Sequence, residues 1–226
     1  MKKYCIYGLL LAAITNPLAA NAFEWNNLNI FKNKTKETKE IPTRYTPVTP
    51  ESAANSIQQL NNQISALDTV TQNVFLSIVA ALSPQDEVNS FRAEMVSILA
   101  EPTITEYERS NRMSSLMSSF AKSLPDNQSY VTSKISGMSN SQKASLINNL
   151  AVLSKCSYNF TDISNQYSNI LSGLSISRSN VSALANAAIK NSAKATKNKA
   201  ESIENIVMQV SELVKANGIN FILPNN

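Results

Sequence analysis

Few residues of this sequence have types and spacing that could do chemistry, and a set of lysines near the C-terminal end is the clearest. Lys190, Lys194 and Lys197 stand at i, i+4 and i+7, with Lys199 two residues further on. The first three share one face of a helix. Such a stripe could contact an anionic surface, for example lipid headgroups or lipopolysaccharide. The alternative is an ordinary solvated face on an alanine-rich helix.

The composition argues against the common kinds of catalytic and metal site. The chain has no His and only 4 Gly, so Ser-His-Asp triads, imidazole zinc sites and glycine-rich phosphate loops are not expected. Glu106 and Glu108 stand two apart on a predicted helix and therefore do not face one site, whereas Glu108 and Arg112 fit a surface ion pair. We expect no catalytic residue, no metal and no cofactor, and we expect that the protein is not an enzyme.

The first 22 residues are typical of a bacterial secretory signal peptide. Lys2 and Lys3 precede an apolar stretch that is too short to span a membrane, and Ala20-Asn21-Ala22 forms an A-x-A cleavage site. An uncleaved N-terminal anchor is the alternative. We expect export across the inner membrane to the periplasm, the cell surface or the medium. Loss of the two lysines lowers the formal net charge of +4 by two, so nucleic acid is not an expected partner.

Cys156 is the one cysteine that remains after such a cleavage, because Cys5 leaves with the signal peptide. A single cysteine in an exported protein is either a free thiol or forms a disulfide between chains. The other interpretation is a small buried apolar residue on a helix.

Residues 23–49 predict an N-terminal arm followed by a proline-containing linker. The arm carries Phe23, Trp25 and Phe31, and the linker over residues 32–49 is polar, charged and interrupted by prolines. The aromatic residues could dock on a partner protein. Alternatively, the arm folds back and covers an apolar face of its own chain.

From Thr49 onward the apolar residues follow a helical period, so the fold class is predicted to be all-α. Thr49 is a plausible N-cap with Pro50 at N1, and Ile57, Leu60, Ile64 and Leu67 begin a heptad pattern. We expect an elongated antiparallel, coiled-coil-like bundle of three long helices with a small appendage of short helices. The expected helical region is 50–218, divided into a long helix over 50–82, short helices over 84–138, long helices over 140–174 and 178–216, and a tail over 219–226.

Two functional hypotheses follow. The first is an exported interaction protein of the bacterial envelope or cell surface, with protein partners and room for homo-oligomers. The second is a membrane-active or lipid-binding helical bundle, toxin-like, which would use the lysine stripe and the broad apolar face of residues 70–82.

The order of one long helix, several short helices and two long helices resembles the minor pilus proteins of type IV secretion systems. The resemblance lies in layout and covers the chain after the signal peptide, and no motif or single residue is carried over from it. It implies a place in a secretion or pilus-type assembly.

Overall fold

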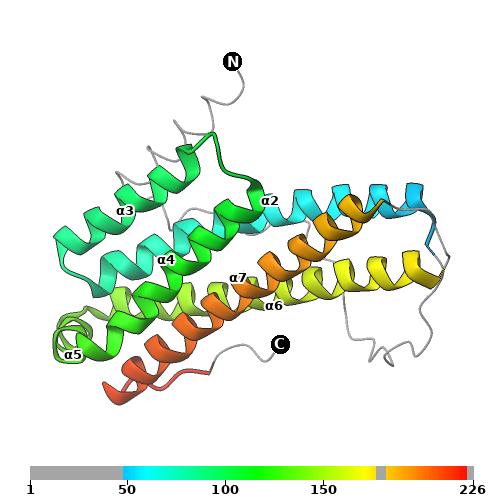
Figure 1. Ribbon diagram of the computed structural model, residues 1–226. Helices are drawn as coiled ribbons and strands as arrows, with labels where there is room; N and C mark the ends of the chain where they lie inside the picture. Colours follow the sequence, from blue (N-terminus) through cyan, green and yellow to red (C-terminus); the bar gives the residue numbers. More distant parts are fainter. Residues whose placement is uncertain (1–47, 177–181, 223–226) are drawn as a thin grey trace. The chain divides into compact units, whose positions relative to one another are not determined.

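The computed structural model describes residues 48–176 and 182–222, and those residues are helical with no strand among them. The prediction of an all-α protein is confirmed. Six helices follow one another in the described part of the chain (Figure 1). They are α2 (Pro50–Leu82), α3 (Gln85–Ala100), α4 (Glu106–Asp126), α5 (Gln128–Gly137), α6 (Asn140–Ile176) and α7 (Ala183–Ala216). The predicted signal peptide and most of the arm and linker lie outside the described residues, as do residues 177–181 and 223–226.

Local capping interactions set most of the helix ends. The Thr49 hydroxyl accepts from the Ser52 backbone N–H at the start of α2. At the start of α6, Ser139 and Gln142 form the reciprocal capping box that their spacing predicts, since each side chain accepts from the other's backbone N–H. At the end of α7, Gly218 has a φ of 75° and its N–H donates to the Lys215 carbonyl. This left-handed glycine after the helix is the expected stop signal.

Some helix ends differ in detail from the local patterns of the sequence. Ser83-Pro84 is expected to end the helix over 50–82 and to cap the next one. Ser83 is indeed the C-cap of α2 and Pro84 is the N-cap residue of α3, but no side chain makes a capping bond there. The pattern Thr103-Ile104-Thr105-Glu106 predicts a capping box, but the cap of α4 is Thr105, whose hydroxyl accepts from the Glu108 N–H. A glycine weakens a helix without having to end it, and α6 therefore continues past Gly173 to Ile176.

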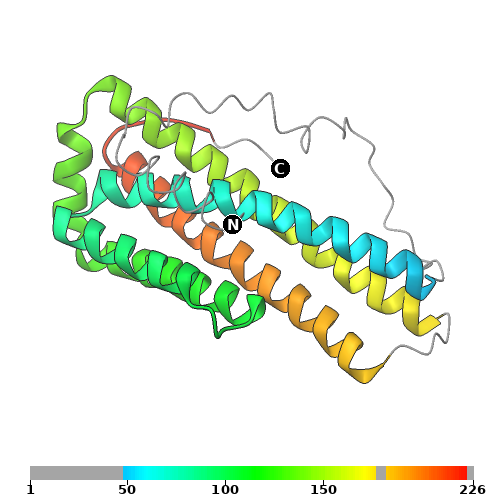
Figure 2. The ribbon, with the colours of Figure 1, turned by 90° about the horizontal axis from the view of Figure 1, so that it is seen from above.

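Helix α6 packs against α2 on one side and most extensively against α7, and α7 also packs along α4 (Figures 1 and 2). Small residues allow α6 and α7 to approach closely. The hydroxyls of Ser157 and Ser164 reach across to the backbone carbonyls of Ala200 and Ala193 at 3.0 and 2.9 Å. As the residue number rises in α6 it falls in α7, so these two helices are antiparallel.

An aromatic cluster lies where α2, α3 and α4 meet. Phe75, Phe91 and Phe120 come one from each helix, and their rings pack edge to face with centroids 5.5 to 6.2 Å apart. Such aromatic pairs contribute about 0.5–1.5 kcal/mol each beyond the area that they bury. The segment over residues 84–138, expected as an appendage, is thus joined to the long helices through a shared aromatic core.

Candidate interaction surfaces

The lysine stripe lies on the solvent side of α7. Lys190, Lys194 and Lys197 are all exposed, and the Lys197 ammonium lies 3.7 Å from the Glu201 carboxylate. Among the described residues, no carboxylate lies within ion-pair distance of Lys190 or Lys194. Lys190 and Lys194 therefore remain available to an anionic partner, although their exposure does not identify one.

Lys199 points the opposite way and is buried. Its Nζ donates to the Asp68 carboxylate of α2 at 2.5 Å and lies over the Phe160 ring, 5.3 Å from the centroid. Burial raises the pKa of the Asp68 carboxyl, and the Lys199 charge offsets part of that rise. This ion pair joins α2 to α7, two helices that otherwise make few contacts. The sequence contains a signal for it, since Lys199 falls off the face that the other three lysines share.

Cys156 lies inside the helical unit, with 1% of its surface exposed. Burial raises the pKa of its thiol, which disfavours the reactive thiolate. A disulfide between chains would require the surrounding helices to open. The structure therefore places Cys156 where a packing role is the simpler interpretation.

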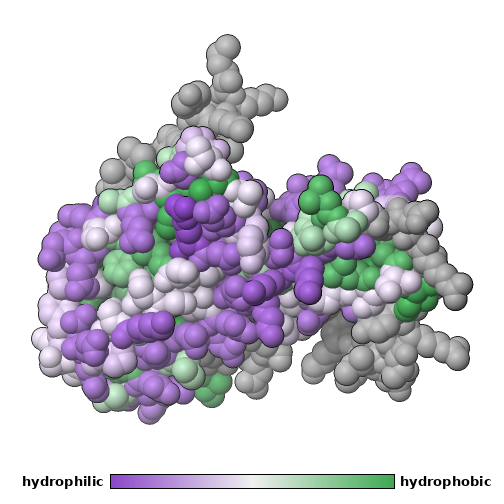
Figure 3. Space-filling model, in the orientation of Figure 1, coloured by the Kyte–Doolittle hydropathy of each residue, from purple (hydrophilic) through white to green (hydrophobic). Residues whose placement is uncertain are grey.

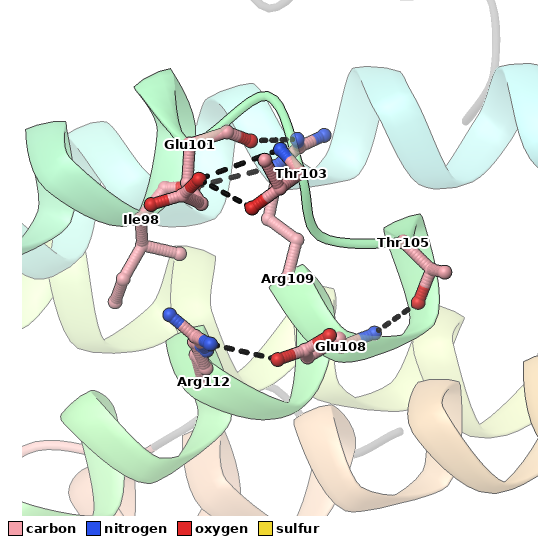
Figure 4. Close-up of polar contacts among 7 residues, drawn as sticks. All are labelled: Ile98, Glu101, Thr103, Thr105, Glu108, Arg109 and Arg112. Atoms are coloured by element: carbon pink, nitrogen blue, oxygen red, sulfur yellow. Dashed lines mark hydrogen bonds and ion pairs between the residues drawn. The ribbon is translucent and has the colours of Figure 1, made fainter.

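The corner between α3 and α4 is held by polar contacts (Figure 4). The Arg109 guanidinium donates to the backbone carbonyls of Ile98 and Glu101 at 3.3 and 2.9 Å, near the C-terminal end of α3, and forms an ion pair with Glu106. The predicted surface pair of Glu108 and Arg112 is present at 2.7 Å. Cations near the final carbonyls of a helix stabilise it, so the contacts of Arg109 are explained by stabilisation of the end of α3.

Several large apolar side chains remain exposed on the helices. Leu184, which the helical period assigns to the buried face of α7, is 81% exposed, and Ile176 at the end of α6 is 50% exposed. The heptad pattern missed this because it does not show how far the neighbouring helices extend. Figure 3 shows apolar residues gathered on the part of the visible face where α6 ends and α7 begins. The other exposed large apolar residues in the described part are Val96, Tyr158, Met208 and Ile222.

Two further features bear on the candidate surfaces. Within residues 48–176 and 182–222, no three Cys, Asp or Glu side chains gather in a group that could hold a metal ion. Helix α2 is the one described helix long and apolar enough to cross a membrane, and 44% of its most apolar stretch is buried within the structure. The core helix of a soluble protein meets the same criterion.

Phe23, Trp25 and Phe31 lie outside the described residues, so their role stays a prediction.

Comparison with known proteins provides no further guide. No family model, no curated protein and no solved structure matches this chain.

Proposed function

We propose that this protein is an exported, non-enzymatic helical protein that mediates contacts between proteins in the bacterial envelope or at the cell surface. The observation that carries the proposal is the set of large apolar side chains that the helices expose, above all Leu184 and Ile176. Exposed apolar side chains that gather in one region are typical of protein contact surfaces. Further support for export comes from the signal-like first 22 residues.

The proposal includes the layout expected from the sequence, a bundle of three long antiparallel helices with the shorter helices attached. The packing of α6 against both α2 and α7 supports it, and the contacts of α4 along α7 make the attachment extensive. A place in a secretion or pilus-type assembly would suit such a layout, because long helices can present contact surfaces that are far apart.

The test is to fractionate native cells, cross-link, and identify what co-purifies with the protein. We expect it in the periplasmic or surface fraction, cross-linked to one or a few specific proteins. Recovery in the cytoplasmic fraction would refute export. A species in the exported fractions that forms no cross-link to any protein would refute the interaction role.

The N-terminal arm can be tested separately. Purified protein with and without residues 23–48 is compared in pull-downs, with the partner found by cross-linking as the readout. A docking arm predicts that the shortened chain recovers clearly less partner. Equal recovery would show that Phe23, Trp25 and Phe31 do not dock there.

The second candidate function is a membrane-active or lipid-binding bundle. It is favoured by the exposure of Lys190, Lys194 and Lys197 along one side of α7, since basic faces attract anionic lipids. Vesicles with and without anionic lipid distinguish the two functions. Protein that neither binds nor permeabilises anionic vesicles would exclude the membrane function and leave the first proposal standing.

A further inference from the structure

The exposed side of α7 carries charges that are sorted by sign along the helix. Lys199 faces α2 through its ion pair with Asp68. Lys197 and Glu201, two residues before and after it, therefore lie about half a turn round the helix, on the side away from α2. Six exposed residues share that side, within about 80° at 3.6 residues per turn. In chain order they are Lys190, Lys194, Lys197, Glu201, Glu204 and Met208, and we call this row the α7 stripe.

No described helix covers the α7 stripe. Helix α6 packs on the side of Ala193 and Ala200, whose carbonyls accept from its serines. Helix α4 contacts Asn198 and Ser202 on another side, and the stripe lies between these two contacts. Figure 3 shows mostly hydrophilic or neutral residues along the path that α7 takes in Figure 1.

The stripe is basic in its first half and acidic in its second. Three lysines are followed by two glutamates, and Glu212 continues the acidic half one turn beyond Met208. Within the described residues, the one ion pair of the stripe joins Lys197 to Glu201 at 3.7 Å, with both side chains more than half exposed. Such an exposed pair contributes little. A face with this order of charges is complementary to a copy of itself that runs in the opposite direction.

An antiparallel copy would place opposite charges in register. The spacings of four and three residues along the stripe are those of a coiled-coil seam. If residue 199 of each copy lies at the same level, Lys197 faces Glu201 of the second copy and Lys194 faces Glu204 of the second copy. A two-fold axis repeats each contact, so the two stripes would form four ion pairs between them.

Tyr158 of α6 lies where such an axis would pass. The hydrogen bond from Ser157 to α7 sets Tyr158 level with residue 199. Tyr158 stands two residues after Cys156, which lies toward Thr71 of α2, so the tyrosine projects away from α2, as the stripe does. It is 52% exposed. Aromatic residues near the centre of an interface contribute most to binding, and a two-fold axis at this level brings two copies of Tyr158 together.

Met208, the apolar member of the stripe, fits the same register. It is 51% exposed. In the antiparallel arrangement it faces Lys190 of the second copy, whose aliphatic stem can cover an apolar side chain while the ammonium stays in water. The exposed apolar residues of this side thus occupy positions that a symmetric dimer would cover.

Charges on the neighbouring helices lie beside the stripe. On α4, Glu108 and Arg112 pair with each other, and Lys122 stands one turn after Ser118, which contacts α7. On α6, the antiparallel register places Lys143 beyond the level of Glu212. Each lies outside the row that two copies would share, so the match of charges in that row depends on α7 alone.

We propose that two copies of this protein associate through the α7 stripe, antiparallel and about a two-fold axis level with residue 199. The shared row from Lys190 to Met208 is about 27 Å long at the helical rise per residue. Because exposed ion pairs set direction and register more than affinity, we expect a reversible dimer with a Kd between about 1 and 100 μM. This inference goes beyond the proposed function and is independent of it.

The test is sedimentation velocity of the purified protein, without the predicted signal peptide, over a range of concentrations. We expect a monomer–dimer equilibrium at about 50 mM salt and association that is at least about fivefold weaker at about 500 mM. K194E/K197E makes the stripe acidic and E201K/E204K makes it basic, so each variant alone should stay monomeric. Mixed in equal amounts, the two variants should form a heterodimer, because each supplies the charges that the other lacks.

Two further variants localise the contact. Y158A should weaken association by about fivefold or more, as expected for loss of a central aromatic contact. E87K/E94K is the matched control for E201K/E204K, because it makes the same change of charge on α3, a helix that packs against α2 and α4. It should dimerise as the unchanged protein does. Circular dichroism confirms that each variant is folded.

Several outcomes would overturn the proposal. A protein that stays monomeric up to about 500 μM at low salt would do so, as would a dimer that both charge-reversed variants retain, which would place the interface elsewhere. Folded charge-reversed variants that fail to associate when mixed, or a control variant that no longer dimerises, would show that the order of charges in the stripe is not what pairs the copies. A monomer that is cross-linked to an envelope protein in cells would refute this inference while the proposed function stands.

Discussion

Replacing Asp68 and replacing Lys199, the two partners of the buried ion pair, should lower the stability of the protein by different amounts. The Lys199 side chain is 4% exposed, whereas the Asp68 side chain is 28% exposed. Removing the carboxylate therefore strands a buried ammonium, while removing the ammonium leaves a carboxylate that can turn toward water. Breaking a buried pair from one side generally costs about 3–5 kcal/mol, and we expect D68N to approach this range and K199M to fall below it.

One interaction that survives in D68N limits the loss of stability. The Phe160 ring, which lies beneath the ammonium, contributes a cation–π interaction of about 1–2 kcal/mol that remains in the variant. We therefore expect D68N to lower the free energy of unfolding by about 3 kcal/mol. For K199M, with Asp68 partly hydrated, we expect a loss of about 1–2 kcal/mol.

The assay is equilibrium urea unfolding at pH 7, followed by the helical circular dichroism signal, for the unchanged protein, both single variants and the double variant D68N/K199M. The double variant should be more stable than D68N by about 1–2 kcal/mol, because it contains no stranded charge. If K199M is as destabilising as D68N, or the two losses simply add, the assignment of Lys199 as the buried partner is refuted.

Three further predictions concern single residues. Burial raises the pKa of Tyr167 to about 12 from an ordinary value of 10. Between pH 10 and 12 the unfolded chain therefore loses this proton first, and the free energy of unfolding falls as the pH rises. In urea unfolding across that window the free energy of unfolding of Y167F should fall less steeply with pH, and equal slopes for the two proteins would contradict the pKa shift. G218A should lower the free energy of unfolding by about 1 kcal/mol, because φ is 75° at this glycine. G137A is the control: Gly137 lies at the end of α5 with open space around it, and the substitution should raise the free energy of unfolding by about 0.5–1 kcal/mol. Equal effects of the two substitutions in urea unfolding would exclude backbone strain at Gly218. In protein lacking residues 1–22, the Cys156 thiol should react with Ellman's reagent about a hundredfold more slowly in the native state than in urea, and fast native labelling would show that the thiol is accessible.

Much of the helical structure could be predicted because its signals are local. The heptad pattern and the Thr49-Pro50 start predict a helix over 50–82, and α2 spans Pro50–Leu82. The capping box at Ser139 and the glycine at Gly218 mark true helix ends. Helix starts were predicted less reliably where two nearby residues both fit an N-cap pattern, as Thr103 and Thr105 do for α4. Gly173 predicts a helix end near residue 174, whereas α6 continues to Ile176, because a glycine buried within a helix looks the same in the sequence as one that ends it.

The candidate site could be predicted only in part. The spacing of Lys190, Lys194 and Lys197 predicts a shared face, and the structure leaves all three exposed on α7. The exposure of Leu184 could not be found in this way, because it fits the same period as the buried residues further along the helix. Its exposure depends on where α2, α4 and α6 end beside it, and periodicity within one helix contains no information about the length of its neighbours.

By itself, the sequence determined that this chain is helical, where most of its helices begin and end, and which side chains share a helix face. These properties follow from interactions between residues that are at most a few positions apart. Only the tertiary structure decided that Lys199 pairs with Asp68, 131 residues away, that Cys156 is buried, and that Leu184 is not. Each of these depends on which helix lies alongside, and the free energy that selects the neighbour comes from packing over the whole helical unit.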